Sequence, residues 1–512
     1  MLIKTFGSAV YGIDATTITV EVNCDTGTKF FLVGLPDNAI KESQQRLAAA
    51  FKNTGYRMPG KKIVVNMAPA DIRKEGSAYD LTIAIGILAA SGQIPPDGIE
   101  NHMIMGELSL DGKLMPIKGA LPIAIRARED GFKGFFLPIE NAREAAIVEG
   151  IDVYGIHDIT ELIAFLKGET QLIPTKVDIR KEFENIQEKN DLDFADVKGQ
   201  ENIKRALEIA AAGGHNAILI GPPGAGKTML ARRLPTILPP MTVEEALETT
   251  KIHSVAGKVS KNNSLVSQRP FRAPHHTISD VALVGGGGNP QPGEISLAHN
   301  GVLFLDELPE FKRTVLEVMR QPLEERKVTI SRARLSVDFP ASFMLIASMN
   351  PCPCGFHNHP EKECVCGPGI VQRYLNRISG PLLDRIDLHV EVTPVTFSEL
   401  SKERYSEPSS SVRKRVQQAR EVQAERFKNN QGVYANAQMG SRQLREVCKL
   451  STECAALLRT AVDKIGLSAR AFDRILKVAR TIADLEGFEN IQAEHVAEAI
   501  QYRTLDRENW SG

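Results

Sequence analysis

The sequence predicts a mixed α/β fold class that ends in a helical region. β-branched runs alternate with helix-like segments in residues 1–168, and this pattern is typical of α/β structure. The alternation returns in residues 193–395, where an apolar strand runs directly into a glycine-rich loop and a helix, as in nucleotide-binding cores. Residues 396–512 carry apolar side chains at spacings of three and four, which predicts helices. A chain of 512 residues has room for about three domains.

The predicted elements follow in order along the chain. In the N-terminal region the runs TTITVEV, KFFLVGL and KIVVNMA are predicted strands, because β-branched residues dominate them. The segments IKESQQRLAAAFKNTG and GALPIAIRAREDG are predicted helices. A polar, charged stretch follows, so residues 169–192 are predicted to be a linker.

Composition gives little information about partners but some about compartment. The net charge is −1, so a polyanion partner would need a local basic surface. The N-terminus lacks the apolar core of a secretory signal, and the most apolar run, LTIAIGILAA, is far shorter than the ~18 residues that span a bilayer. We therefore expect a cytoplasmic protein without a membrane partner. In that reducing compartment, clustered cysteines favour metal binding over disulfides.

The most specific motif is GPPGAGKT, which fits the phosphate-loop pattern G-x-x-x-x-G-K-[ST] between a strand and a helix. Its glycines let backbone N–H groups wrap a phosphate, the lysine reaches the outer phosphates, and the threonine hydroxyl ligates Mg²⁺. The motif predicts ATP and Mg²⁺ as cofactors. The residues of this cradle are Gly221, Pro222, Pro223, Gly224, Ala225, Gly226, Lys227 and Thr228.

An acidic pair ends the next apolar strand, GVLFLDE, about eighty residues further on. Asp306 is suited to holding Mg²⁺, and Glu307 is suited to orienting the attacking water. Two adjacent acids at a strand end are often only a helix N-cap. The phosphate loop upstream favours the catalytic interpretation.

Two further polar residues are candidates for the same site. Asn350 ends the strand SFMLIASMN, where it can contact the γ-phosphate and the attacking water. Arg385 lies in SGPLLDRIDLHV, and an arginine there can stabilise the γ-phosphate of a neighbouring subunit. The alternative for Arg385 is an ion pair with Asp384 or Asp387, since such pairs are common.

These motifs, in this order, resemble the AAA+ ATPases of the branch that contains magnesium-chelatase subunits. The stretches VVNMAPADIRKEGSAYDL and MGELSLDGKLMPIKGALPIAIRA resemble the Lon protease proteolytic fold. Together they resemble the magnesium-chelatase-like YifB/ComM family over essentially the whole chain. The resemblance implies a Lon-protease-like domain at 1–168, an AAA+ core at 193–395 with an inserted hairpin and cysteine-rich loop, and a connection with a helical lid at 396–512. From that lid Arg470, with Arg474 as its rival, is expected to reach the nucleotide.

The Lon-like part departs from the protease pattern at both catalytic positions. Gap-free alignment with the protease motif puts Ala78 at the position of the nucleophilic serine and Leu121 at that of the activating lysine. Ser77 is one residue away, and a nucleophile without its base is inert. We therefore expect a structural or binding module rather than a peptidase.

The resemblance also implies a function. We expect an ATP-hydrolysing ring, a hexamer in keeping with the family, that moves branched or single-stranded DNA as a branch-migration helicase in homologous recombination and natural transformation. One alternative is a chelatase-like motor that remodels a protein partner. Another is a nucleotide-binding scaffold with slow turnover.

Three segments are candidate DNA contacts. Residues 251–279 hold five Lys and Arg but no Asp or Glu, so they could face phosphates, or form a solvated loop. The glycine-rich segment 280–300 lies where relatives carry an insertion that points into the ring channel. The segment 326–341 is a predicted hairpin with Arg332 and Arg334 at its turn.

A cysteine-rich stretch, NPCPCGFHNHPEKECVC, starts at the last residue of the strand that ends in Asn350. Its C-x-C-x₉-C-x-C spacing predicts a closed, structural Zn²⁺ site, with His357 or His359 as an alternative ligand. Free thiols or a redox switch are the other interpretations. The four predicted ligands are Cys352, Cys354, Cys364 and Cys366.

Overall fold

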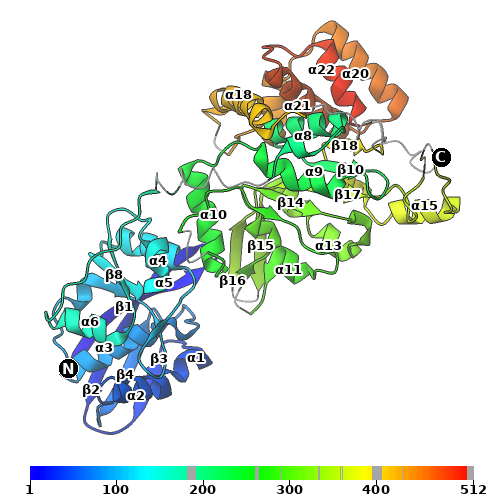
Figure 1. Cartoon of the computed structure of the whole chain (residues 1–512). Helices are drawn as coiled ribbons and strands as arrows, with labels where there is room; N and C mark the ends of the chain where they lie inside the picture. The colour runs from blue at the N-terminus through cyan, green and yellow to red at the C-terminus, as the bar shows by residue number, and fades with distance from the viewer. Residues whose placement is uncertain are drawn as a thin grey trace.

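The computed structural model describes residues 1–179, 182, 192–259, 264–288, 290–332, 335–357, 359, 361–394, 406–430 and 432–503. The N-terminal part, the nucleotide-binding core and the C-terminal helices follow one another across the molecule (Figure 1). Most of the predicted linker 169–192 lies outside the described residues. The α/β fold class predicted from the sequence is confirmed.

The N-terminal part contains a seven-stranded mixed sheet in the order β3-β4-β2-β1-β5-β8-β9. β1 and β2 form a long antiparallel hairpin, and β4 continues it, so the three β-branched runs predicted as strands all lie in one half of the sheet. The strands are β1 (Leu2–Tyr11), β2 (Asp14–Asp25), β3 (Phe30–Val33), β4 (Lys62–Ala68), β5 (His102–Ile104), β8 (Gly134–Pro138) and β9 (Asp152–Ile156), with a small separate pair, β6 (Glu107–Leu108) and β7 (Leu114–Met115).

Helices cover this sheet, and one of them is buried on all sides. α3 (Asp80–Ala90) contains the apolar run LTIAIGILAA, and every one of its residues is buried against β1 and β2. The run is therefore a core helix. Among the helices in the described ranges, none is both long and apolar enough to cross a membrane. The other helices are α1 (Asn38–Lys41), α2 (Ser43–Asn53), α4 (Ala120–Glu129), α5 (Ile139–Ala145) and α6 (Ile159–Leu166).

The core is a five-stranded parallel sheet in the order β11-β14-β17-β10-β18. Its central strands are fully buried, which explains their uninterrupted apolar sequences. The strands are β10 (Ala217–Ile220), β11 (Phe271–Arg272), β14 (Val302–Leu305), β17 (Met344–Met349) and β18 (Leu388–Glu391). The helices are α8 (Glu201–Gly213), α9 (Lys227–Arg233), α10 (Val243–Val255), α11 (Asp280–Val284), α12 (Glu294–Leu297), α13 (Arg313–Glu317), α14 (Arg320–Glu325), α15 (Pro368–Leu375) and α16 (Gly380–Leu383).

Two antiparallel insertions extend from the core. The glycine-rich segment forms the short pair β12 (Gly285–Gly286) and β13 (Gln291–Pro292). The predicted hairpin is formed by β15 (Lys327–Arg332) and β16 (Leu335–Pro340). Arg334, one of the two cations expected at its turn, lies outside the described residues.

The C-terminal helices sit on α8 of the core and share its hydrophobic cluster. Arg205 of α8 pairs with Glu498 at 3.0 Å and with Glu486 at 2.8 Å, so charges fasten the same contact. These helices are α18 (Ser409–Phe427), α19 (Ser441–Val447), α20 (Thr452–Ile465), α21 (Ala469–Leu485) and α22 (Ala493–Gln501).

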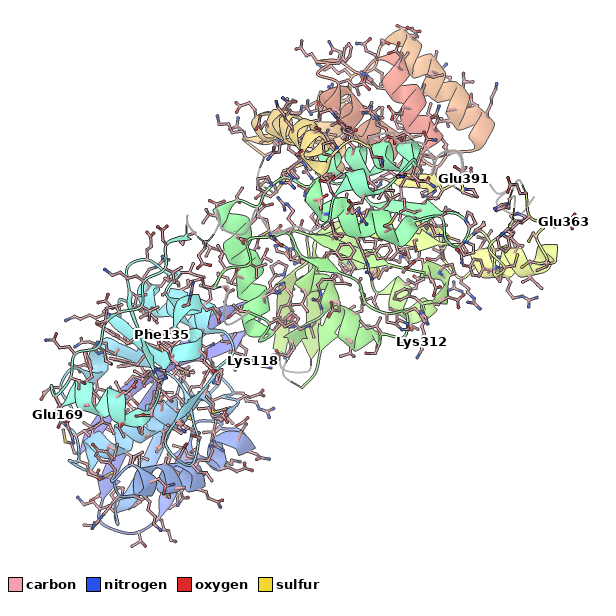
Figure 2. All side chains as sticks on the ribbon, in the orientation of Figure 1. Lys118, Phe135, Glu169, Lys312, Glu363 and Glu391 are labelled. Atoms are coloured by element: carbon pink, nitrogen blue, oxygen red, sulfur yellow. The ribbon has the colours of Figure 1, made fainter. Side chains whose placement is uncertain are left out.

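The N-terminal part docks on α10 of the core through its helix α4 (Figure 1). The backbone N–H of Gly119 donates to the carbonyl of Ser254 at 3.1 Å, and the Ser254 hydroxyl donates to the buried carboxylate of Glu144. Lys118 lies at this junction (Figure 2), where its aliphatic stem passes next to Gly257. The N-terminal part is therefore fixed to the helix that leads into residues 251–279.

Candidate nucleotide site

The phosphate loop connects the carboxyl end of β10 to α9. Gly224 and Gly226 have φ angles of +79° and +83°, which side chains other than glycine adopt only with strain. A Cβ at Gly221 would lie 2.4 Å from the carbonyl oxygen of Val392, so this position has no room for a side chain. The loop can therefore approach a phosphate with its backbone N–H groups.

Lys227 is held over the loop by three acceptors. Its Nζ donates to the carbonyls of Gly221 at 2.7 Å and Pro222 at 2.9 Å, and to Oδ1 of Asn350 at 3.1 Å. Burial lowers the pKa of Lys227, while the charges of Asp306 and Glu307 partly offset that effect. The sequence-predicted Lys227 and Asn350 thus meet at the edge of the sheet.

Thr228 and Asp306 also meet there, as the motif predicted. Oγ1 of Thr228 donates to Oδ2 of Asp306 at 2.7 Å, so a hydroxyl and a carboxylate, both ligands that Mg²⁺ accepts, are side by side. The Ser348 hydroxyl donates to the other oxygen of Asp306 and fixes its orientation. Sequence reasoning missed Ser348, although a polar residue in an otherwise buried apolar strand was a usable signal.

The backbone of Glu307 is in the left-handed region, which residues other than glycine seldom adopt. Its φ is +55°, and its side chain is 57% exposed. The 3₁₀ turn that follows it has no side-chain cap from Glu307, which does not favour the N-cap interpretation. Its Oε2 lies 3.6 Å from Nδ1 of His276, which belongs to the basic segment 251–279. The position of β11 beside β14 brings His276 there, and no local spacing reveals it.

Arg385 is buried within the subunit, with 6% of its surface exposed. Its guanidinium donates to the carbonyl of Pro381 at 2.6 Å and pairs with Glu324 of α14 at 2.5 Å. The two aspartates considered from the sequence are therefore not its partners. A role for Arg385 at the γ-phosphate of a neighbouring subunit stays a prediction, and it requires release from Glu324.

The two candidate lid arginines differ in surroundings. Arg474 pairs with Asp387 at 2.7 Å, and Asp387 also contacts Nδ1 of the buried His215 at 3.2 Å. Burial alone would raise the pKa of Asp387, but Arg474 and His215 outweigh it and hold that pKa well below its usual range. Arg470 is 63% exposed, and its ion pair with Asp384 is long, at 3.9 Å. Of the two, Arg470 is the one with freedom to reach a nucleotide.

The basic segment 251–279 is not an open cationic surface. Four of its five cations pair with carboxylates from outside the segment, and the fifth, Lys261, lies outside the described residues. Counting charges within the segment could not reveal these acids, so the structure does not favour it as the phosphate-facing surface. The pairs are Lys251–Asp14 at 3.7 Å, Lys258–Glu294 at 3.4 Å, Arg269–Glu245 at 2.9 Å and Arg272–Glu294 at 2.6 Å.

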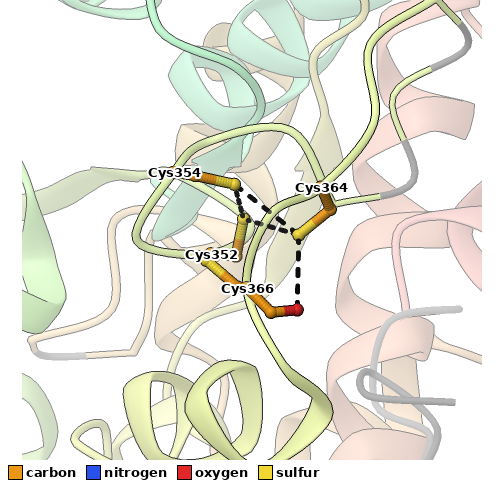
Figure 3. Close-up of side chains that lie close together, drawn as sticks. All are labelled: Cys352, Cys354, Cys364 and Cys366. Atoms are coloured by element: carbon orange, nitrogen blue, oxygen red, sulfur yellow. Dashed lines mark hydrogen bonds between the residues drawn. The ribbon is translucent and has the colours of Figure 1, made fainter.

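The four clustered cysteines converge, as their spacing predicted (Figure 3). Sγ of Cys352 lies 3.3 Å from that of Cys354 and 3.7 Å from that of Cys364, and all four thiols are within 4.8 Å of one another. Among the described residues, neither histidine joins this cluster. Nδ1 of His359 instead accepts two backbone N–H groups, from Glu361 and Lys362, at 3.1 Å each.

The position aligned with the protease serine lies beside a cavity of about 1330 Å³, which is lined by the N-terminal part and by Val255 and Gln291 of the core. Ser77 and Ala78 line it, together with Lys118. Leu121 is fully buried in the sheet's core instead.

Comparison with known proteins yields matches along the chain. A family model described as "Magnesium chelatase, subunit ChlI" matches residues 193–400, and two related models match residues 20–141 and 406–503. The chain is 46% identical to Competence protein ComM of Haemophilus influenzae, over 98% of this chain and 97% of that protein. It is 44% identical to Uncharacterized protein YifB of Escherichia coli, over 98% and 96%. It is also 31% identical to Lon protease 2 of Bacillus subtilis, over 31% of this chain and 33% of that protein.

Proposed function

Because the chain belongs to the magnesium-chelatase subunit ChlI family and is similar over nearly its full length to ComM and YifB, we propose that it is an ATP-hydrolysing ring motor acting on DNA. Its proposed role is branch migration in homologous recombination and natural transformation. Membership in the family implies ATP and Mg²⁺ as cofactors and suggests ATPase activity. The printed name of the relative, a competence protein, supports a competence-related role. We also propose a cytoplasmic location.

The observation that carries the ATPase proposal is the convergence of four side chains at the carboxyl edge of β10, β14 and β17. Lys227 contacts Asn350, and Thr228 contacts Asp306, although 78 to 123 residues separate the partners. Parallel sheets place ligands at this edge. When bound, Mg²⁺ would supply positive charge that offsets the negative charge of the ATP phosphates.

The chain's own groups have distinct proposed roles in hydrolysis. The loop N–H groups and Lys227 neutralise and position the phosphates, and Thr228 and Asp306 are the proposed Mg²⁺ ligands. Glu307, exposed at the strand end, orients the attacking water and receives its proton. Asn350, already in contact with Lys227, keeps that lysine and the γ-phosphate in register. Each role uses a group that lies at the same sheet edge.

A ring, proposed as a hexamer, gives Arg385 and Arg470 their proposed roles. Arg385 would act on the γ-phosphate of a neighbour, and Arg470 on the nucleotide of its own subunit. The hairpins β12–β13 and β15–β16 are the proposed DNA contacts in the channel. The division into 1–168, 193–395 and 396–512 is part of the same proposal.

The cysteine cluster is the proposed site of a structural Zn²⁺. Zinc–sulfur bonds of about 2.3 Å in a tetrahedron give sulfur–sulfur separations of about 3.8 Å. The separations of 3.3 to 3.7 Å among three of the four thiols are close to this value. Four thiolate ligands leave no open position, so the metal would stabilise the loop rather than catalyse a reaction.

The test measures ATP hydrolysis with and without DNA, beside strand movement on a branched DNA substrate. We expect DNA to stimulate hydrolysis and the wild type to move the branch, while Lys227→Ala does neither. Hydrolysis that ignores DNA would contradict the DNA proposal and favour a chelatase-like motor on a protein partner. An absence of hydrolysis would contradict both and leave a nucleotide-binding scaffold.

A further inference from the structure

The cysteine loop lies against the nucleotide site itself. It starts at Cys352, two residues after Asn350, whose side chain accepts the hydrogen bond from Lys227. Cys352 is fully buried in the hydrophobic cluster that also contains Met349, Val371 and Tyr374. The loop is therefore anchored in the core on one side and leaves the nucleotide-contacting strand on the other.

Direct contact with the phosphate loop occurs at Gly355, the residue after the second cysteine. Its φ is +83°, and a Cβ built there would lie 2.5 Å from Cδ of Pro223. Pro223 is part of the phosphate loop, and Gly221 of the same loop donates a backbone hydrogen bond to the carbonyl of Met349 at 3.2 Å. The cysteine loop thus touches the phosphate loop at one point and continues the strand that supports it at another.

The C-terminal end of the cysteine loop leads directly into α15. After Cys366 the chain passes through Gly367, the N-cap of α15. α15 leads through α16 to Arg385, and Val371 and Tyr374 of α15 pack in the cluster that contains Cys352. The loop therefore lies against both the phosphate loop and α15.

We propose that Zn²⁺ held by the four cysteines acts as a clamp on the nucleotide site, so that metal occupancy sets ATP affinity. This rests on the ATPase function proposed above. On binding, each S–H bond is replaced by an S–Zn bond and four protons pass to solvent. The closed cage holds Gly355 against Pro223 and fixes Asn350 opposite Lys227. Without the metal, the four cysteines have no common ligand to hold them together, so the loop is less firmly fixed and the phosphate loop loses that support.

The test uses the full-length protein and two kinds of variant. Cys364→Ser/Cys366→Ser removes two ligands and is expected to lose zinc, measured by elemental analysis, and to bind a fluorescent ATP analogue about tenfold more weakly, or about 1.4 kcal/mol. Gly355→Ala keeps all four thiols but places a methyl group against Pro223. It is expected to retain zinc and still bind the nucleotide more weakly. Cys24→Ser, in the N-terminal sheet, is the control for loss of a buried thiol.

Chelation of the wild type, followed by re-addition of Zn²⁺, tests the same link without a mutation and decides the case if the double variant does not fold. Recovery of ATP affinity on reloading supports the clamp. A wild type that takes up no zinc overturns the metal site, and unchanged ATP affinity after zinc removal overturns the coupling. Neither result depends on DNA, so failure of the DNA proposal would appear separately, as zinc-loaded protein whose hydrolysis ignores DNA.

Discussion

We expect Arg474→Met to lower the stability of the protein and Arg470→Met to lower its rate of ATP hydrolysis, although both residues lie on α21. The two residues lie one turn apart on α21, and methionine keeps much of the apolar stem of each. Arg474 pairs with the buried Asp387 at 2.7 Å, whereas Arg470 is 63% exposed and 3.9 Å from Asp384. The change is the same, but the surroundings differ.

The magnitude follows from what each substitution leaves behind. Removing one partner of a buried ion pair typically costs about 3–5 kcal/mol, because a buried charge remains without compensation. His215 still contacts Asp387 in Arg474→Met, so we expect the lower end, about 3 kcal/mol. Exposed pairs contribute about 0–1 kcal/mol, so Arg470→Met is expected to keep nearly wild-type stability. Its expected defect is instead an ATP hydrolysis rate lowered about 100-fold or more, the size of the effect when one donor to transition-state charge is lost.

Thermal unfolding and steady-state hydrolysis of both variants check this reasoning. A loss of about 3 kcal/mol lowers the melting temperature by roughly 6–12 °C in a unit of this size. The reasoning is refuted if Arg474→Met melts with the wild type, or if Arg470→Met hydrolyses ATP at the wild-type rate. The second outcome would remove Arg470 from the nucleotide site.

Three further predictions concern Glu307, Gly221 and Asp387. Glu307→Gln is expected to bind ATP normally in a fluorescence titration but to slow single-turnover hydrolysis at least about 100-fold, and an unchanged rate would favour the scaffold alternative. Gly221→Ala puts a Cβ 2.4 Å from the carbonyl oxygen of Val392, so chemical denaturation should show a loss of about 1–3 kcal/mol, whereas unchanged stability would mean that the loop shifts freely. The pKa of Asp387 is lower in the folded than in the unfolded protein. Its contribution to the free energy of unfolding is therefore present above about pH 4 and is lost as the pH falls below that value. Asp387→Asn should flatten this part of the stability–pH curve, and an unaltered curve would contradict the assignment.

Sequence reasoning was most successful where the signal is local. The phosphate loop, the strands around it and the cysteine spacing depend on residues close in sequence, and the edge of a parallel sheet then brings Lys227 to Asn350 and Thr228 to Asp306. The partner of Arg385 could not be predicted, because Glu324 is 61 positions away on a helix with no motif. Pairs of this kind are fixed by tertiary packing, which no spacing rule encodes.

The four described cations of the basic segment 251–279 pair with carboxylates from outside the segment. It begins on α10, where Lys251 pairs with Asp14 of the N-terminal sheet, and it ends beyond β11, where His276 meets Glu307. Between these points Arg272 holds Glu294. Because each of the four described cations pairs with an acid from outside the segment, these pairs connect the segment to neighbouring elements. Through these pairs the described part of the segment contacts both the N-terminal sheet and Glu307.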